Sequence, residues 1–286
     1  MPNDLRRSNN EGMQMKFDMG QAWNTATGLL SKNKDVVLIV AGVFIFLPTL
    51  ALNLLVPGLG QPPANPEDTD AIVSALVETY QEYWWAFLAS ALIQAVGTLA
   101  LLTLLTDTSR PTVGEALKQG GYGILPYLGT QILLGLGTAL VIGLPIGVAV
   151  SSRSPALITI LAFVAIPAAF YVLIKTVLIT PVIAIEKIYN PVRIIKRSWT
   201  LTSGNSLRLL GFFALIIIAM GILFMVINGI LSVVLAAIGG QIQMIGVAIV
   251  SGGLNTVFAV IMLAVLAGVH RQLSGAATED ASDTFT

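Results

Sequence analysis

The sequence predicts an all-α membrane protein with six transmembrane helices, arranged as three repeats and with both termini in the cytoplasm. In each repeat a short helix at the membrane surface, here called an elbow helix, precedes two spans. Two observations lead to this fold class. Hydrophobic residues make up 55% of the 286 residues and charged residues only 10%, whereas soluble domains carry about 25% charged residues. Apolar runs long enough to cross a bilayer also recur along the chain.

Charge and cysteine content narrow the classes of function. The formal net charge is zero, so nothing indicates a nucleic-acid partner. The chain contains no cysteine, which excludes disulfides and thiolate metal sites. The N-terminal segment is mostly polar and lacks the pattern of a cleaved signal peptide. We therefore expect the first span to direct membrane insertion.

Six apolar runs are the expected spans, and each exceeds the ~20 residues that a ~30 Å hydrocarbon core requires. The runs are continuously apolar rather than alternating, which favours helices over the strands of a barrel. Residues 17–270 should form the membrane domain, between disordered cytoplasmic ends at residues 1–16 and 271–286. The expected spans are residues 36–56, 84–105, 124–150, 155–180, 207–238 and 242–269.

The distribution of Lys and Arg sets the expected orientation. Basic residues precede the first span, lie between spans two and three and between spans four and five, and begin the tail. Residues 57–83 contain acidic residues and no basic one, and only Arg153 departs from the pattern. Because cytoplasmic loops carry the excess of Lys and Arg, both termini are expected in the cytoplasm.

Three short segments with helix-capping residues precede spans one, three and five. They read DMGQAW from Asp18, TVGEAL from Thr112 and NPVRII from Asn190. The first two have capping-box spacing, and Asn190 is followed by Pro at the first helical position. Short amphipathic segments are common beside membranes, so coincidence is one interpretation. Their phase with the helix pairs favours a repeat of one elbow helix and two spans.

The third elbow helix has two distinct faces. Its expected apolar face comprises Val192, Ile195 and Trp199. Its expected basic face comprises Arg193, Lys196 and Arg197. A helix of this kind lies flat on the membrane surface, where anionic head groups hold the basic face. Gly204 is suited to the left-handed backbone conformation that commonly follows the last turn of such a helix.

This part of the chain carries a resemblance to a known family. An apolar helix reaches Pro181, VIAIE follows it up to Glu186, Pro191 comes next, and RSWTLTSG begins at Arg197. The order resembles the signature of the glycerophosphoryl diester phosphodiesterase membrane-domain family, and DMGQAW resembles that family's N-terminal elbow. The resemblance covers residues 17–270 and implies a polytopic bacterial membrane protein. Lys187-Ile188 and Ile194-Ile195 depart from the family pattern without disturbing this architecture.

The residues do not favour an enzyme. In some relatives the membrane unit is fused to a soluble phosphodiesterase domain that needs metal-binding carboxylates and catalytic histidines. The sole histidine here is His270, which we expect to be an interfacial residue without a chemical role. The sequence contains no HExxH, P-loop or GxSxG motif. We therefore expect no catalysis, no metal and no cofactor.

Two charged residues flank the end of the fourth span. Lys175 lies within an apolar run, so it is either a buried functional charge or a side chain that extends to the membrane surface. Glu186 is either part of a ligand or proton site or a structural clasp that pairs with Arg193, Arg197 or Lys175. We favour the clasp.

Polar residues within the spans are the remaining candidates. Gln94, Gln131, Asn228 and Asn255 are expected to hydrogen-bond between helices. Asn228 and Asn255 adjoin glycine-rich breaks, so they are also candidates for lining a substrate cavity.

The sequence thus favours a non-catalytic protein of the bacterial cytoplasmic membrane. It would bind or organise lipids with anionic head groups, or serve as the membrane partner of another membrane or soluble protein. The alternative is a transporter or exporter of a small or amphipathic molecule that uses the broken spans.

Overall fold

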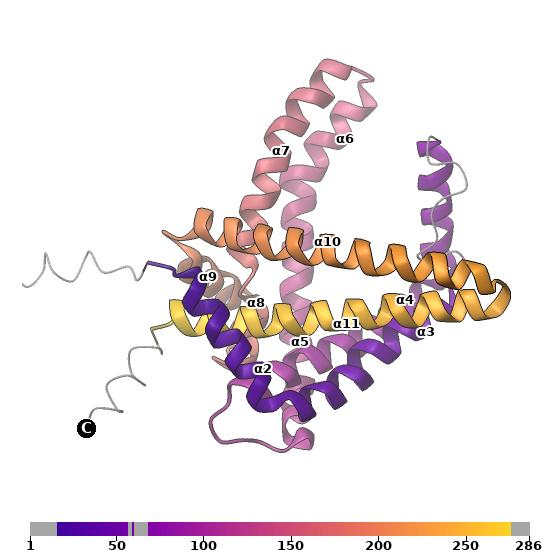
Figure 1. Ribbon diagram of the computed structural model, residues 1–286. Coiled ribbons are helices and arrows are strands. Elements are labelled where there is room, and N and C mark those ends of the chain that lie inside the picture. Colours follow the sequence, from indigo (N-terminus) through magenta and orange to yellow (C-terminus); the bar gives the residue numbers. More distant parts are fainter. Residues whose placement is uncertain (1–15, 57–58, 60–67, 276–286) are drawn as a thin grey trace, which may run out of the picture. The chain divides into compact units, whose positions relative to one another are not determined.

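The computed structural model describes residues 16–56, 59 and 68–275, and in these ranges it contains helices and no strand (Figure 1). Six helical segments within them are long and apolar enough to cross a membrane, which confirms the expected number of spans. They are Met19–Leu55, Asp70–Thr106, Val113–Ser151, Pro155–Ala184, Ser206–Ile238 and Gly240–Leu273. The chain therefore has the build of an integral membrane protein.

Three of the spans consist of more than one helical element. The first is α2 (Met19–Ala41), the π-helix η1 (Gly42–Phe46) and α3 (Leu47–Leu55). The third is α5 (Val113–Thr138), the π-helix η2 (Ala139–Gly143) and α6 (Leu144–Ser151), and the fourth is α7 (Pro155–Thr176) and α8 (Ile179–Ala184). The other helices are α4 (Thr69–Thr106), α9 (Pro191–Thr202), α10 (Ser206–Ile238) and α11 (Gly240–Leu273).

Both π-helical segments come just before a proline, Pro48 or Pro145. A proline within a helix lacks the N–H donor, and its ring clashes with the carbonyl four residues earlier. The wider π turn at that carbonyl lets the helix continue past the proline.

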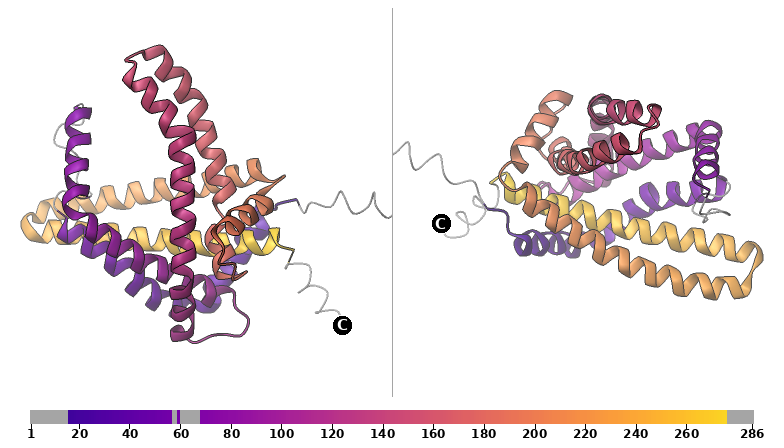
Figure 2. Two further views of the ribbon diagram at one scale, coloured as in Figure 1. Left: turned by 180° about the vertical axis from the view of Figure 1, so that it is seen from behind. Right: turned by 90° about the horizontal axis from the view of Figure 1, so that it is seen from above.

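The structure divides into two compact units. One comprises the described residues within Met1–Thr27, Pro126–Leu215 and Val265–Thr286. In this unit α6 and α7 lie side by side as an antiparallel pair (Figures 1 and 2). Its core contains Leu178, Ile183, Ile194, Leu209 and Val269, all of which are almost fully buried. Helices α8 and α9 thus belong to a packed part of the protein.

The other unit comprises the described residues within Gly28–Leu125 and Ile216–Ala264. Close approaches at glycines hold its helices together. A Cβ on Gly97 would lie 2.3 Å from Cβ of Phe44, and a Cβ on Gly120 would lie 2.7 Å from the carbonyl oxygen of Val96. Only glycine allows backbones to pack at this distance, as is typical of helix contacts in membranes.

All three expected elbow helices have their caps. The Asp18 side chain accepts a hydrogen bond from the N–H of Gln21, and Asn190 accepts one from the N–H of Arg193. The backbone N–H groups of Thr112 and Glu115 each donate to the side chain of the other residue. A capping box of this kind satisfies backbone donors that the first helical turn leaves unpaired.

The three segments nevertheless continue differently. Only α9 is a separate short helix. Helix α2 continues to Ala41 with a kink at Asn33, where φ is −123° and ψ is 16°. Helix α5 runs from Val113 to Thr138, so the expectation of a separate short helix at Thr112 is wrong.

The ends of several elements also differ from expectation. Helix α4 begins at Thr69, with Asp68 as its N-cap, so much of the acidic segment 57–83 is helical. Helix α11 includes Arg271, Gln272 and Leu273, which we had assigned to the tail. The remaining residues of the expected disordered ends lie outside the described residues, apart from 16, 274 and 275.

Candidate functional site

The candidate site lies where the fourth span ends and α9 packs against it. Helix α7 ends at Thr176, so its last carbonyl groups lack partners within the helix. The hydroxyl of Ser198 on α9 donates to the carbonyl oxygen of Lys175 at 2.8 Å. Ser198 is fully buried, and its hydroxyl thereby satisfies one of these carbonyls. This contact fixes α9 against the end of α7.

Glu186 forms the second attachment of α9. The Arg197 Nε–H donates to both carboxylate oxygens of Glu186, at 3.0 and 2.8 Å. His270 Nε2 lies 2.8 Å from Glu186 Oε1. The exposed fraction of the side chain is 38% for Arg197, 17% for Glu186 and 3% for His270. The expected ion pair of Glu186 is therefore present, with Arg197 as its partner.

The environment of Glu186 favours its ionised form. Burial opposes ionisation, but the hydrogen bonds from Arg197 and His270 and their charges outweigh it, so the pKa of Glu186 lies below its ordinary value. An ionised carboxylate only accepts hydrogen bonds. His270 Nε2 must therefore carry the hydrogen and donate it to Glu186.

His270 is the residue whose role the sequence analysis missed. We expected an interfacial side chain without a role, but its ring is buried and holds Glu186. The contact joins residues 84 positions apart in the sequence, so local pattern could not reveal it. Its only sequence signal was a lone histidine in the last turn of an apolar helix.

Lys175 is buried, with 4% of its surface exposed. Its Nζ donates to the hydroxyl of Ser203 at 3.1 Å and lies 5.5 and 5.6 Å from the ring centroids of Tyr171 and Trp199. Aromatic faces attract an ammonium group at this distance. These contacts favour a buried charge over a side chain that extends to the surface. Between the described residues Lys175 and Glu186 no ion pair is present.

Helix α9 buries a different face from the one that we expected to be apolar. Its buried residues are Ile194, Ser198, Leu201 and Thr202. Val192 and Trp199 are instead exposed, by 64% and 38%, and Ile195 is partly exposed. Arg193 and Lys196 are exposed as well. The serine in the middle of the buried face concealed it in the sequence, because a polar residue there breaks the apolar pattern.

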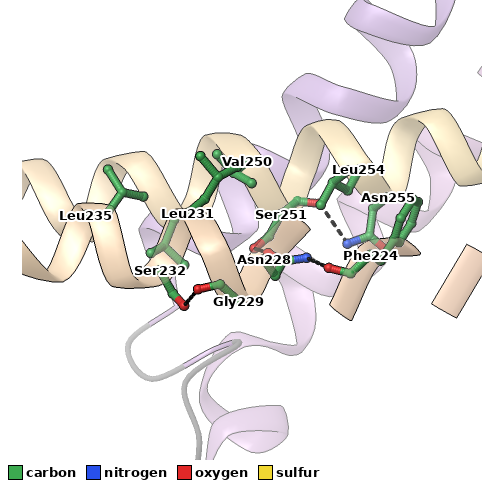
Figure 3. Close-up of a pocket in the computed structure, with 11 residues that line it drawn as sticks. Phe224, Asn228, Gly229, Leu231, Ser232, Leu235, Val250, Ser251, Leu254 and Asn255 are labelled. Atoms are coloured by element: carbon green, nitrogen blue, oxygen red, sulfur yellow. Dashed lines mark hydrogen bonds between the residues drawn. The ribbon is translucent and has the colours of Figure 1, made fainter. Parts of the chain in front are cut away.

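The other unit contains a groove between α10 and α11 with a volume of about 420 Å³. Asn228, Ser232, Ser251 and Asn255 contribute its polar groups (Figure 3). The hydroxyl of Ser251 donates to Asn228 Oδ1 at 3.4 Å, which joins the two helices. The side-chain amides of Asn228 and Asn255 donate to Phe224 and Ser251 carbonyl groups. The two expected cavity residues thus line one groove.

Gln94 and Gln131 bond within their own helices, so the expectation of hydrogen bonds between helices is wrong for both. Gln94 donates to the hydroxyl of Ser90 in α4, and Gln131 donates to that of Tyr127 in α5. Among the described residues, no group of three or more His, Asp or Glu side chains could hold a metal ion. The contacts around Glu186 orient α9 and place a carboxylate between a guanidinium group and an imidazole ring.

The comparisons with known proteins add no identification. No protein-family model, curated protein or solved structure matches this chain.

Proposed function

We propose that this chain is a non-catalytic integral membrane protein of the bacterial cytoplasmic membrane that binds anionic lipid head groups through α9. One observation carries the proposal. Val192 and Trp199 are exposed apolar side chains on a helix that also exposes Arg193 and Lys196. Exposed apolar and basic side chains on one surface helix are what the boundary between head groups and acyl chains binds.

The fixed position of α9 supports this role. The helix is attached through Ser198 to the end of α7 and through Arg197 to Glu186. Because these two contacts occupy its inner side, Arg193 and Lys196 remain available for phosphate groups. A preformed basic surface binds head groups without the entropic cost of ordering a free segment.

The test is lipid retention by the purified full-length protein in mild detergent, measured by mass spectrometry. The variant R193Q/K196Q leaves Arg197 to hold Glu186. At roughly 1 kcal/mol per basic residue, affinity for phosphatidylglycerol or cardiolipin should fall about 25-fold. The loss should be smaller at high salt, where wild-type binding is already screened.

The control variant is R110Q/K118Q, which removes the same charge from exposed residues on another segment. It should retain anionic lipid at the wild-type level. If R193Q/K196Q also retains lipid at the wild-type level, lipid binding by α9 is wrong. Helix α9 would then serve a membrane or soluble protein partner.

The proposed topology places both termini in the cytoplasm and treats the three capped segments as starts of three repeats. The Lys and Arg distribution and the three caps support it. Reporter fusions should give cytoplasmic signals after Lys34, Arg110, Lys187 and Arg271. Fusions near Asp68 and Gly240 should give external signals. A cytoplasmic signal at Asp68 would contradict this topology.

A transporter is the second candidate, and the groove between α10 and α11 favours it. Asn228 lies about 15 Å along the helix from the end of α10 at Ile238, or half of a ~30 Å hydrocarbon core. Transporter sites are typically at this depth and beside helix breaks. Asn228→Leu together with Asn255→Leu should abolish uptake or export of the cargo in vesicles. Unchanged flux would exclude this groove as the path.

Membership of the glycerophosphoryl diester phosphodiesterase membrane-domain family remains a proposal. The contact between Glu186 and Arg197 supports it, because these residues are the charged members of the two resembling motifs, VIAIE and RSWTLTSG. We also propose that the protein does not hydrolyse glycerophosphodiesters. Purified protein should not cleave glycerophosphodiesters, and measurable cleavage that is lost in His270→Ala would contradict it.

A further inference from the structure

An apolar groove lies in the unit that contains residues 28–125 and 216–264. One wall comes from residues 30–46 of α2 and η1, and the other from residues 253–261 of α11. Its volume is about 470 Å³. Lys34 is the one charged residue among those that line it, and the hydroxyl of Thr256 is bonded to the carbonyl of Gly252. The lining therefore offers an apolar groove with a single cation about one helical turn from one end.

Two glycines, Gly42 and Gly253, line the groove from opposite walls. A Cβ on Gly42 or on Gly253 would meet no atom within 4 Å. At the neighbouring Gly252 a Cβ would instead lie 3.3 Å from the Phe46 ring, so the two walls meet there. Gly42 is also the first residue of the π-helix η1. Such irregular turns occur frequently at binding sites.

We propose that the groove binds one acyl chain of an anionic membrane phospholipid, with the phosphate of its head group on Lys34. The uninterrupted apolar run of the first span begins at Val36, which places Lys34 at the level of the head groups. The helix from Lys34 to Phe46 is about 18 Å long at 1.5 Å per residue. This length is close to one leaflet, about half of the ~30 Å hydrocarbon core.

The charge pattern favours an acyl chain over a helix from a second copy. A single cation at the membrane-surface end complements a lipid phosphate and leaves the remaining length to hydrocarbon. This site is separate from α9 and does not depend on the function proposed for that helix.

The test is native mass spectrometry of the full-length protein with added phosphatidylglycerol or phosphatidylcholine. We would use the R193Q/K196Q background, so that lipid on α9 does not obscure the result. Gly42→Leu and Gly253→Leu place a side chain in the groove from opposite walls, and each should lose the retained phosphatidylglycerol. Gly221→Leu is the matched control, because Gly221 also has open space around its Cβ position but lies on α10 outside the groove.

Lys34→Gln tests the head group separately. It should lower the preference for phosphatidylglycerol over phosphatidylcholine about five-fold, while a lipid is still retained. Wild-type lipid retention in both leucine variants would overturn the proposal. A retained free fatty acid, or a dimer that the leucine variants dissociate, would also overturn it. If the leucine variants do not fold, an unchanged head-group preference in Lys34→Gln overturns it alone.

Discussion

Helices α9 and α5 begin alike and end differently. Asn190 caps the first turn of α9, and Thr112 with Glu115 caps that of α5. Helix α9 then ends at Thr202, but α5 continues to Thr138. The difference shows that a cap determines where a helix starts and contains no information about where it stops. A separate elbow helix requires both signals.

Glycine makes the difference, because it has opposite roles in the two helices. Gly204 has a φ of 78°, and Ser203 before it is extended, so the chain leaves the helix there. Gly120 lies inside α5, where its missing side chain lets the helix approach the carbonyl oxygen of Val96. One glycine provides conformational freedom, and the other provides space.

The largest expected effect comes from the clasp, which holds α9. Glu186→Gln places an amide nitrogen against donors and removes the charge that Arg197 and His270 bind. We expect a loss of about 2.5 kcal/mol in the free energy of unfolding, measured by SDS titration in mixed micelles. This is less than the loss from breaking a fully buried pair, because 38% of the Arg197 side chain is exposed.

The matched control is Glu115→Gln, which alters the exposed capping carboxylate of α5 and should leave stability nearly unchanged. An equal loss in both variants would mean that the clasp adds nothing beyond a surface carboxylate.

The same carboxylate predicts a dependence of stability on pH. The pKa of Glu186 is lower in the folded protein than in the unfolded chain, whose value is about 4.3. Its contribution is therefore present above pH ~4.3 and is lost as the pH falls through the lower folded value. Melting temperatures measured between pH 7 and pH 3 should fall less steeply in Glu186→Gln than in the wild type.

The next effect tests the packing role of Gly120. A Cβ in Gly120→Ala would lie 2.7 Å from a backbone oxygen, so the two helix backbones must separate. We expect a loss of about 2 kcal/mol in unfolding free energy. The neighbouring Gly121→Ala is the control, since its Cβ would meet no atom within 4 Å. It should stabilise the helix by about 0.5–1 kcal/mol, and a loss there would contradict the packing argument.

A smaller effect tests the conformational role of Gly204. Gly204→Ala forces a side chain into the left-handed region and should cost about 1.5 kcal/mol, again by SDS titration. Gly204→Asn should cost less, because Asn tolerates this conformation. If Asn and Ala cost the same, space rather than backbone conformation would be the reason for glycine.

The smallest effects should come from the caps themselves. Asn190→Ala and Thr112→Ala each remove one side-chain acceptor from a first turn and should each lower stability by about 1 kcal/mol. Similar losses would support the view that the two starts are equivalent. A loss several times larger at Asn190 would show that its cap also supports the packing of α9.

Local chemistry in the sequence predicted much of this fold. Apolar runs gave the six spans, and the three caps form at Asp18, Thr112 and Asn190. These features depend on neighbouring residues, whose spacing is visible in one sequence. The left-handed Gly204 just after the end of α9 was predictable for the same reason.

Features that depend on distant residues were not predictable. His270 reaches Glu186 across 84 positions, and Ser198 lies on the buried face of α9 because of a carbonyl 23 positions earlier. Gly120 in α5 gave no sign of its partner Val96. The apolar groove lined by Gly42 and Gly253 likewise depends on two helices that are remote in sequence.

The contacts of Lys175 have a consequence for the order of events during synthesis. Its carbonyl and its amine bind Ser198 and Ser203, which follow it by 23 and 28 residues. At 5–20 residues per second, the ribosome adds these residues roughly 1–6 s after Lys175. During that interval the ammonium group has no partner on α9, and we expect water or head groups to solvate it. A chain truncated at residue 190 should therefore react at Lys175 with a water-soluble amine reagent, whereas the complete chain should be protected. The fourth span would thus settle to its final depth only when α9 emerges and binds.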